Sequence, residues 1–371
     1  MSTAITSTPA GRPAARSGGL AGLPGMRSTA LRHLLLMVLA YVGVVLLLQV
    51  LDPFRASQMS SVAYFIPAVA GLTVLTGLNG QISLGHGALM AVGAYTTAVL
   101  LERVPGLPFV VVVLGAVLVT SLVGVIVGAA AARLHGPYLA GATLALAVGV
   151  PGLAIYFEDL LGGEQGLRVK PPTSPDWFEQ LTGATSRTYL AYLGWALALV
   201  VLFLLSNLLN SRVGRQWRAV RDDEVAAQLV GIDLGRSRVV AFVVSAACAG
   251  VAGALYATVI RLAAPGSFTL VLSLSLLTAI VIGGLGSLLG AVLGSVLLVF
   301  LGPFLTERGT GLGLSDIQSA NVAPLVYGLV LVVLMLVAPR GLVGTVRLKL
   351  LQRRTARQRA GERSDAQQTA R

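Results

Sequence analysis

The chain has 371 residues, of which 55% are hydrophobic and 11% charged, with a mean hydropathy of +0.83 and a net charge of +12. A soluble domain carries roughly 25% charged residues, so this composition excludes a soluble enzyme, a disordered protein and a coiled coil. It predicts an all-α polytopic membrane protein. The basic residues form short clusters between long uncharged stretches, a pattern of membrane topology that argues against nucleic acid as a partner.

Uncharged stretches of about 20 residues predict about ten transmembrane helices. They are expected near 33–51, 61–78, 83–101, 109–132, 138–157, 188–210, 239–260, 268–283, 287–304 and 322–338. The uncharged stretches 56–101 and 262–306 are divided only by glycines, so a re-entrant segment is an alternative in both. Split at about residue 187, ten helices give two five-helix halves of opposite topology, as in inverted-repeat transporters.

The basic residues predict the orientation in the membrane. With the N-terminus inside and ten crossings, 20 of the 27 Lys and Arg residues lie on the inner side. This bias follows the positive-inside rule and places both termini in the cytoplasm. The expected organisation is a flexible cytoplasmic tail (1–30), a transmembrane domain (31–344) and a basic cytoplasmic tail (345–371). Within the domain, loop 158–187 is expected outside and the charged, helical loop 211–238, called the inner loop below, is expected inside.

A glycine-rich segment, Gly77–Gly87, joins two apolar stretches. Glycine permits irregular backbone, and Asn, Gln and Ser side chains satisfy backbone groups that a broken helix leaves free. One interpretation is a broken segment that lines a translocation path, and the other is a short turn between closely packed helices. For His86, a hydrogen-bonded packing role is favoured over titration. The candidate path residues are Asn79, Gln81, Ser83, Gly85, His86 and Gly87.

The inner loop has the pattern of a helix that docks into another protein. Arg215, Arg218 and Arg221 recur at helical spacing, and small residues precede Gly231, where a helix can end or a partner can approach closely. The alternative is an amphipathic helix that rests on anionic lipid. The residues expected to make the docking contact are Arg221, Asp222, Asp223, Glu224, Ala226, Ala227 and Gly231.

Glycines also recur at close spacing inside the predicted spans. One pair lies at 124 and 128, another at 250 and 253, and a stripe lies at 286, 290 and 294. Small residues at such spacing allow helices to approach closely. Packing within the chain is the favoured interpretation, and a dimer face at 286–294 is the alternative.

Several segments resemble known permeases. ABC-importer permeases carry a cytoplasmic loop with Glu-Ala-Ala, three residues and Gly; here Glu224 stands one position early and no Ile-x-Leu-Pro follows. Other segments resemble the M-type permease subunit of branched-chain amino-acid ABC importers, in order and spacing, from about Leu31 to Gly344. These segments are GQISLGHGA (80–88), GPYLA (136–140), GGEQGL (162–167), AFVVSA (241–246) and IGGLGS (282–287).

The resemblance implies a multi-pass permease of the plasma (inner) membrane that translocates Leu, Ile or Val, with urea or short amides as an alternative. It implies a homologous second permease, two ATP-binding subunits and an external substrate-binding protein as partners, with membrane lipid around them. The chain itself lacks the phosphate-binding pattern Gly-x-x-x-x-Gly-Lys-Ser/Thr, so it is not expected to be an enzyme. One cysteine, Cys248, gives no metal-binding pattern, and neither a metal nor a cofactor is predicted.

An alternative of another class is an ion-coupled secondary transporter or channel that acts alone. No Asp, Glu or Lys lies within a predicted span, which counts against ion coupling. A membrane scaffold without transport activity is disfavoured because it has no use for the polar, glycine-rich segment.

Overall fold

The structure is a computed structural model that describes residues 29–134, 136–174 and 186–311, with single positions at 178, 180, 315, 318, 325, 326, 328, 329, 332 and 333. Within this part of the chain, eight helical stretches are long and apolar enough to cross a membrane. The predicted all-α polytopic fold is therefore confirmed. The predicted count of ten is not confirmed: the predicted span at 83–101 is not among the eight, and the one at 322–338 lies almost entirely outside the described residues.

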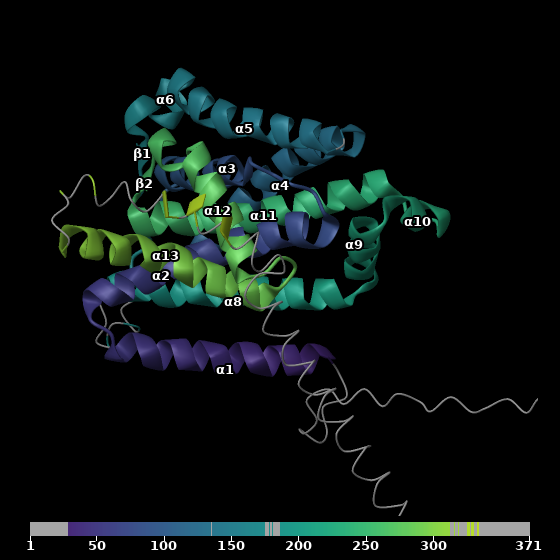
Figure 1. Cartoon of the computed structure of the whole chain (residues 1–371). Coiled ribbons are helices and arrows are strands. Elements are labelled where there is room, and N and C mark those ends of the chain that lie inside the picture. The colour runs from purple at the N-terminus through teal and green to yellow at the C-terminus, as the bar shows by residue number, and fades with distance from the viewer. Residues whose placement is uncertain are drawn as a thin grey trace, which may run out of the picture.

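The bundle consists of long helices whose ends gather on two opposite faces (Figure 1). The long helices are α1 (Thr29–Val50), α2 (Pro53–Leu72), α3 (His86–Arg103), α4 (Phe109–Arg133), α5 (Pro137–Tyr156), α8 (Ser186–Asn210), α11 (Leu234–Ile260), α12 (Leu270–Gly283) and α13 (Leu288–Gly311). The shorter elements are the π-helix η1 (Thr73–Leu78), α6 (Glu158–Leu161), η2 (Gly163–Gln165), β1 (Leu167–Arg168), α9 (Arg212–Asp222), α10 (Glu224–Leu229), β2 (Leu262–Ala263) and η3 (Pro265–Ser267).

Several boundaries differ from the prediction because charged or polar residues lie inside helix ends. α1 begins at Thr29 rather than 33, and α13 ends at Gly311 rather than 304. α2 begins at Pro53 rather than near residue 61, and its first turn carries Arg55. α11 begins at Leu234 rather than 239, because the Asp233 carboxylate caps it by accepting a hydrogen bond from the Arg236 amide at 3.0 Å. Hydropathy ends a span at the first charge, whereas a helix ends where its backbone groups find other partners.

The two long loops lie at opposite ends of the bundle (Figure 1). β1, which lies in loop 158–187, pairs antiparallel with β2, so these segments share one face. Figure 1 shows α6, β1 and β2 at one end of the bundle, and α9 and α10 of the inner loop at the other. We call the end with α9 and α10 the inner end.

Glycines bring the central helix α11 close to its neighbours. A β-carbon at Gly253 would clash with the Met90 carbonyl of α3, and one at Gly124 of α4 would lie 2.5 Å from the Ala246 β-carbon of α11. α12 and α13 also approach closely, because a β-carbon at Gly290 of α13 would lie 2.6 Å from the Gly283 carbonyl oxygen of α12. Glycines 290 and 294 therefore pack within the chain, which disfavours the dimer-face alternative for 286–294.

Replacing Gly253 by Leu should destabilise the bundle, because the new side chain would enter the backbone of α3. We expect the free energy of unfolding to fall by about 1–3 kcal/mol, as overpacking of a full core does. Gly149→Leu is the matched control: a β-carbon at Gly149 of α5 meets nothing within 4 Å, and the expected change is under about 0.5 kcal/mol. Thermal unfolding in detergent checks both, and equal losses would contradict the packing described.

Candidate functional site

The second span is broken at its inner end. After η1, Asn79 still has helical backbone, residues 80–85 form no regular structure, and α3 begins at His86. The Asn79 amide donates to the Ser237 hydroxyl at 3.3 Å, and His86 Nδ1 lies 3.5 Å from the Ser245 hydroxyl. Those two serines are separated by eight residues of α11, or about 12 Å. The break therefore runs along the inner half of the bundle, which favours a broken segment over a short surface turn.

Burial alternates along the break, as it does in extended chain. The side chains of Gln81 and Ser83 are buried, whereas Ile82 is 54% exposed and Leu84 is half-buried. Gln81 donates to the side-chain oxygen of Asn79, and the Leu84 amide donates to the Thr143 hydroxyl of α5 at 3.0 Å. Asn79, Gln81 and Ser83 thus point into the bundle in this conformation. The exposed edge of the break consists of apolar side chains, which the sequence did not indicate.

Glycines 85 and 87 allow two other helices to approach the start of α3. A β-carbon at Gly85 would lie 2.6 Å from the Thr143 carbonyl oxygen, and one at Gly87 would lie 2.8 Å from the Ser273 hydroxyl of α12. That hydroxyl accepts a hydrogen bond from the Gly87 amide at 3.0 Å. His86 between them is fully buried, and its Nε2 has no hydrogen-bond partner among the described residues. The hydrogen-bonded packing role favoured for it stays a prediction.

The inner loop is helical, as predicted, and each of its helices has a defined end. The Asp223 carboxylate caps α10 by accepting from the amides of Val225 and Ala226 at 2.9 and 3.0 Å. After α10, Gly231 adopts a φ of +82° and the Ile232 amide donates to the Ala227 carbonyl at 3.0 Å, which is a Schellman motif. A β-carbon at Gly231 meets nothing within 4 Å, so the fold requires glycine here for its backbone conformation.

Three arginines of α9 bind backbone carbonyls at the inner ends of spans. Arg215 and Arg218 donate to the carbonyls of Asn210 and Leu209, at 3.2 and 3.0 Å, where α8 ends. Arg221 donates from Nη1 to the Gly77 carbonyl in η1, at 2.7 Å. Cations stabilise the carbonyl end of a helix. These contacts disfavour the interpretation of α9 as a helix held chiefly by anionic lipid.

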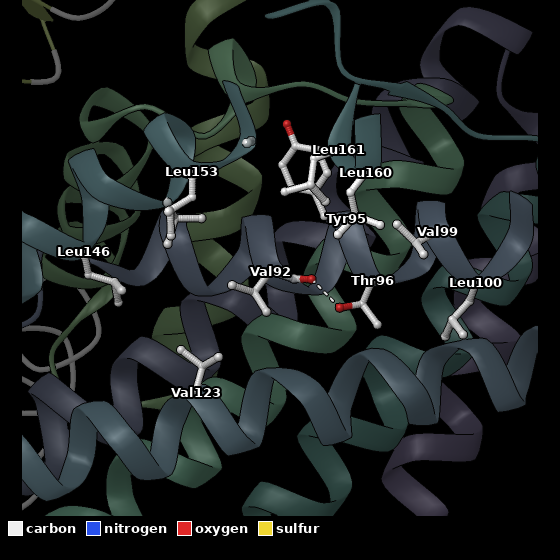
Figure 2. Close-up of a pocket in the computed structure, with 12 residues that line it drawn as sticks. Val92, Tyr95, Thr96, Val99, Leu100, Val123, Leu146, Leu153, Leu160 and Leu161 are labelled. Carbon is white, nitrogen blue, oxygen red and sulfur yellow. Dashed lines mark hydrogen bonds between the residues drawn. The ribbon is translucent and has the colours of Figure 1, made fainter. Parts of the chain in front are cut away.

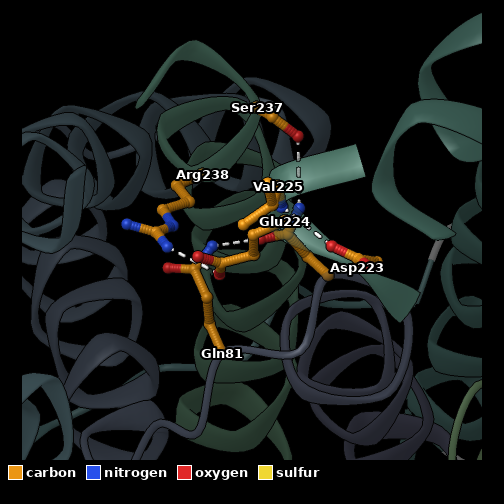
Figure 3. Close-up of polar contacts among 7 residues, drawn as sticks. Gln81, Asp223, Glu224, Val225, Ser237 and Arg238 are labelled. Carbon is orange, nitrogen blue, oxygen red and sulfur yellow. Dashed lines mark hydrogen bonds and ion pairs between the residues drawn. The ribbon is translucent and has the colours of Figure 1, made fainter. Parts of the chain in front are cut away.

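The acidic residues of the inner loop have different roles. Glu224 forms an ion pair with Arg238 of α11 at 2.6 Å, and the Arg238 side chain is only 6% exposed. Figure 3 places this pair beside Gln81 and Ser237. Asp222 pairs with Arg221 at 2.9 Å in a more exposed position. Glu224 and Asp223 therefore hold the loop together, although the sequence suggested that both contact a partner.

α10 and its C-cap expose three large apolar side chains, beside the polar side chains of Glu224 and Gln228. Val225, Leu229 and Val230 are 67%, 83% and 77% exposed. Of the small residues predicted for docking, Ala226 is exposed and Ala227 is buried. Because α10 lies at the inner end of the bundle (Figure 1), this surface is directed away from the spans.

An apolar cavity of about 470 Å³ lies between α3, α4, α5 and α6 (Figure 2). Its wall includes Leu146 and Leu153 of α5, Val123 of α4 and Val92 of α3. The hydroxyl of Thr96 already donates to the Val92 carbonyl at 2.7 Å. The Tyr95 hydroxyl in its wall has no hydrogen-bond partner among the described residues. The cavity offers no charged side chain, so an ammonium or carboxylate group would lose most of its hydration there.

Comparison with known proteins gives a consistent set of relatives. Residues 56–338 match the family described as branched-chain amino acid transport system / permease component. The high-affinity branched-chain amino acid transport system permease protein LivM of Salmonella typhimurium is 33% identical over 349 residues, covering 87% of this chain and 77% of LivM. LivM of Escherichia coli is 31% identical, covering 88% and 79%. LivH of Salmonella typhimurium is 25% identical, covering 74% and 89%. No solved structure matches.

Removing Glu224 should destabilise the inner loop, because it leaves the buried Arg238 without its carboxylate. We expect Glu224→Ala to lower the free energy of unfolding by about 1–3 kcal/mol, less than for a fully buried pair because Glu224 is half exposed. Asp222→Ala, which breaks the exposed pair, should cost under about 1 kcal/mol. Thermal unfolding of both variants measures these losses of stability. A larger loss for Asp222→Ala than for Glu224→Ala would contradict the assignment of Glu224–Arg238 as the stronger ion pair.

Proposed function

The chain belongs to the permease components of branched-chain amino acid transport systems, and we propose that it is the membrane-spanning permease subunit of an ATP-binding-cassette importer for leucine, isoleucine and valine. The observation that carries this proposal is the direct contact between the inner loop and η1, directly before the break in the second span: Arg221 donates to the Gly77 carbonyl at 2.7 Å. A permease driven by separate ATPases requires a loop that the ATPases displace and a segment of the translocation path that moves with this loop.

We assign four kinds of neighbour to the chain. LivM and LivH of Salmonella typhimurium are both named as permease proteins of the high-affinity branched-chain system, which supports a homologous second permease beside this one. Two ATP-binding subunits dock at the inner end, which the bias of basic residues assigns to the cytoplasm. A substrate-binding protein delivers the amino acid at the opposite face, where β1 and β2 pair. Membrane lipid surrounds the remaining surface.

The apolar surface of α10 is the docking site for an ATP-binding subunit in this proposal. Three large apolar side chains exposed at the cytoplasmic end of a membrane protein are not covered by lipid tails, so a protein partner is favoured. The Asp223 cap and the Gly231 turn fix both ends of α10. A short helix with fixed ends transmits a displacement instead of absorbing it.

The translocation path runs along residues 79–87, whose exposed edge lies at 80–84. Ile82 and Leu84 present apolar side chains along this edge, and these match the apolar side chains of leucine, isoleucine and valine better than urea or short amides. The cavity of Figure 2 is disfavoured as a substrate site, because its wall has only the hydroxyls of Tyr95 and Thr96, and no charged group, to receive the ammonium and carboxylate of an amino acid.

An acidic residue on α10 tests this function. Leu229→Asp should greatly reduce copurification of the ATP-binding subunits and ATP-dependent leucine uptake into proteoliposomes, while membrane insertion is retained. The physical reason is that a charge in an apolar interface loses its hydration without finding a partner. Gln216→Glu, which also adds a charge at an exposed position of the inner loop, should leave both measurements near wild type.

The same experiment discriminates between the classes of transporter. Normal copurification and uptake in Leu229→Asp would remove α10 as the docking surface. Leucine uptake by this chain alone, driven by an ion gradient without ATP-binding subunits, would replace the importer by a secondary transporter.

A further inference from the structure

We propose that Arg221 is the residue through which a displacement of α9 and α10 reaches the broken second span. The proposal rests on the function proposed above and identifies the mechanical link within it. Arg221 is a positioning residue: it acts on the path through the backbone at Gly77 and does not contact substrate.

The guanidinium of Arg221 lies where two glycine turns meet. Its Nη1 donates to the Gly77 carbonyl at 2.7 Å. Gly80, with a φ of +79°, leaves room for the arginine stem, since a β-carbon there would lie 3.1 Å from Arg221 Cγ. Gly286, with a φ of +81° in the turn between α12 and α13, lies on the other side, where a β-carbon would be 3.5 Å from Arg221 Nη1.

The two turns also touch each other directly. A β-carbon at Gly77 would clash with the backbone nitrogen of Gly286. One arginine on α9 therefore contacts the end of η1 and the turn that joins α12 to α13 at once. Asp222 fixes the orientation of the guanidinium by accepting from its Nε and Nη2 at 3.1 and 2.9 Å.

Other contacts of the inner loop lead to unbroken helices. Arg215 and Arg218 hold α9 to α8, Trp217 donates to the Ser237 carbonyl of α11 at 3.2 Å, and Glu224 holds α10 to α11. Among the described side chains of α9 and α10, Arg221 is the one hydrogen-bonded to the second span. That span continues into residues 80–84, which are not helical, so a force at Gly77 moves the break first.

Arg221→Gln tests the link, with Arg215→Gln as the matched control. Both variants remove one arginine from α9 that donates to a span-end carbonyl, but only Arg221 reaches the broken span. We expect Arg221→Gln to retain the ATP-binding subunits and ATP hydrolysis while leucine uptake per ATP falls by about tenfold or more, as expected for loss of a charged hydrogen bond. Arg215→Gln should keep uptake per ATP near wild type. Unchanged uptake per ATP in Arg221→Gln, or an equal loss in both variants, overturns the proposal.

A disulfide provides the second, independent test. A β-carbon at Gly80 would lie 3.6 Å from Arg221 Cβ, which is within the range for a disulfide. In a Cys248→Ser background, the Gly80→Cys/Arg221→Cys variant should form this bond on oxidation and recover uptake per ATP relative to its reduced form. The single-cysteine variants should not respond to oxidation. Failure of the bond to form contradicts the geometry, and an oxidised variant with no recovery contradicts the link.

The wild-type complex separates failure of this inference from failure of the proposed function. If the wild-type chain neither retains ATP-binding subunits nor supports leucine uptake, the proposed function is wrong. If the wild-type complex transports leucine but both Arg221 tests give the results that contradict the proposal, the proposed function stands and the role of Arg221 as the mechanical link is wrong.

Discussion

Backbone amides and carbonyls that leave a helix inside an apolar bundle must find other partners, because each unpaired group costs several kcal/mol. The break at residues 80–85 creates such groups, and nearby elements satisfy them. The hydroxyl of Thr143 on α5 accepts from the Leu84 amide, that of Thr76 donates to the Gln81 carbonyl, and that of Ser273 on α12 accepts from the Gly87 amide. This requirement explains why a polar, glycine-rich segment lies between two apolar stretches and why α5 and α12 come so close to it.

The architecture of the inner end follows from the same requirement. Carbonyls at the ends of α8 and η1 receive arginine donors from α9, and α10 is held to α11 by the Glu224–Arg238 pair. Basic residues on which the predicted orientation rests thus also connect the inner loop to three spans. A loop attached in this way moves with the span ends as a unit, which is the property that coupling to an external ATPase requires.

Hydropathy and charge predicted most of the fold, because lipid selects long apolar segments and excludes charge from them. The spans at 109–132, 138–157 and 188–210 were placed within two residues of α4, α5 and α8. The sequence could not reveal that Arg221 binds the carbonyl of Gly77, since a backbone acceptor carries no sequence signal. It also could not show that Asn79, Gln81 and Ser83 point inward, because that direction depends on where α11 and α5 lie.

The central claim is that the state of the ATP-binding subunits reaches residues 79–85 through the inner loop. The most direct measurement is the rate at which a polar thiol reagent labels Ile82→Cys, in a Cys248→Ser background, in the assembled and reconstituted complex. The account predicts that this rate differs severalfold between the nucleotide-free and the ATP-bound, hydrolysis-arrested states. Equal labelling rates in both states, in a complex that transports leucine, would contradict it.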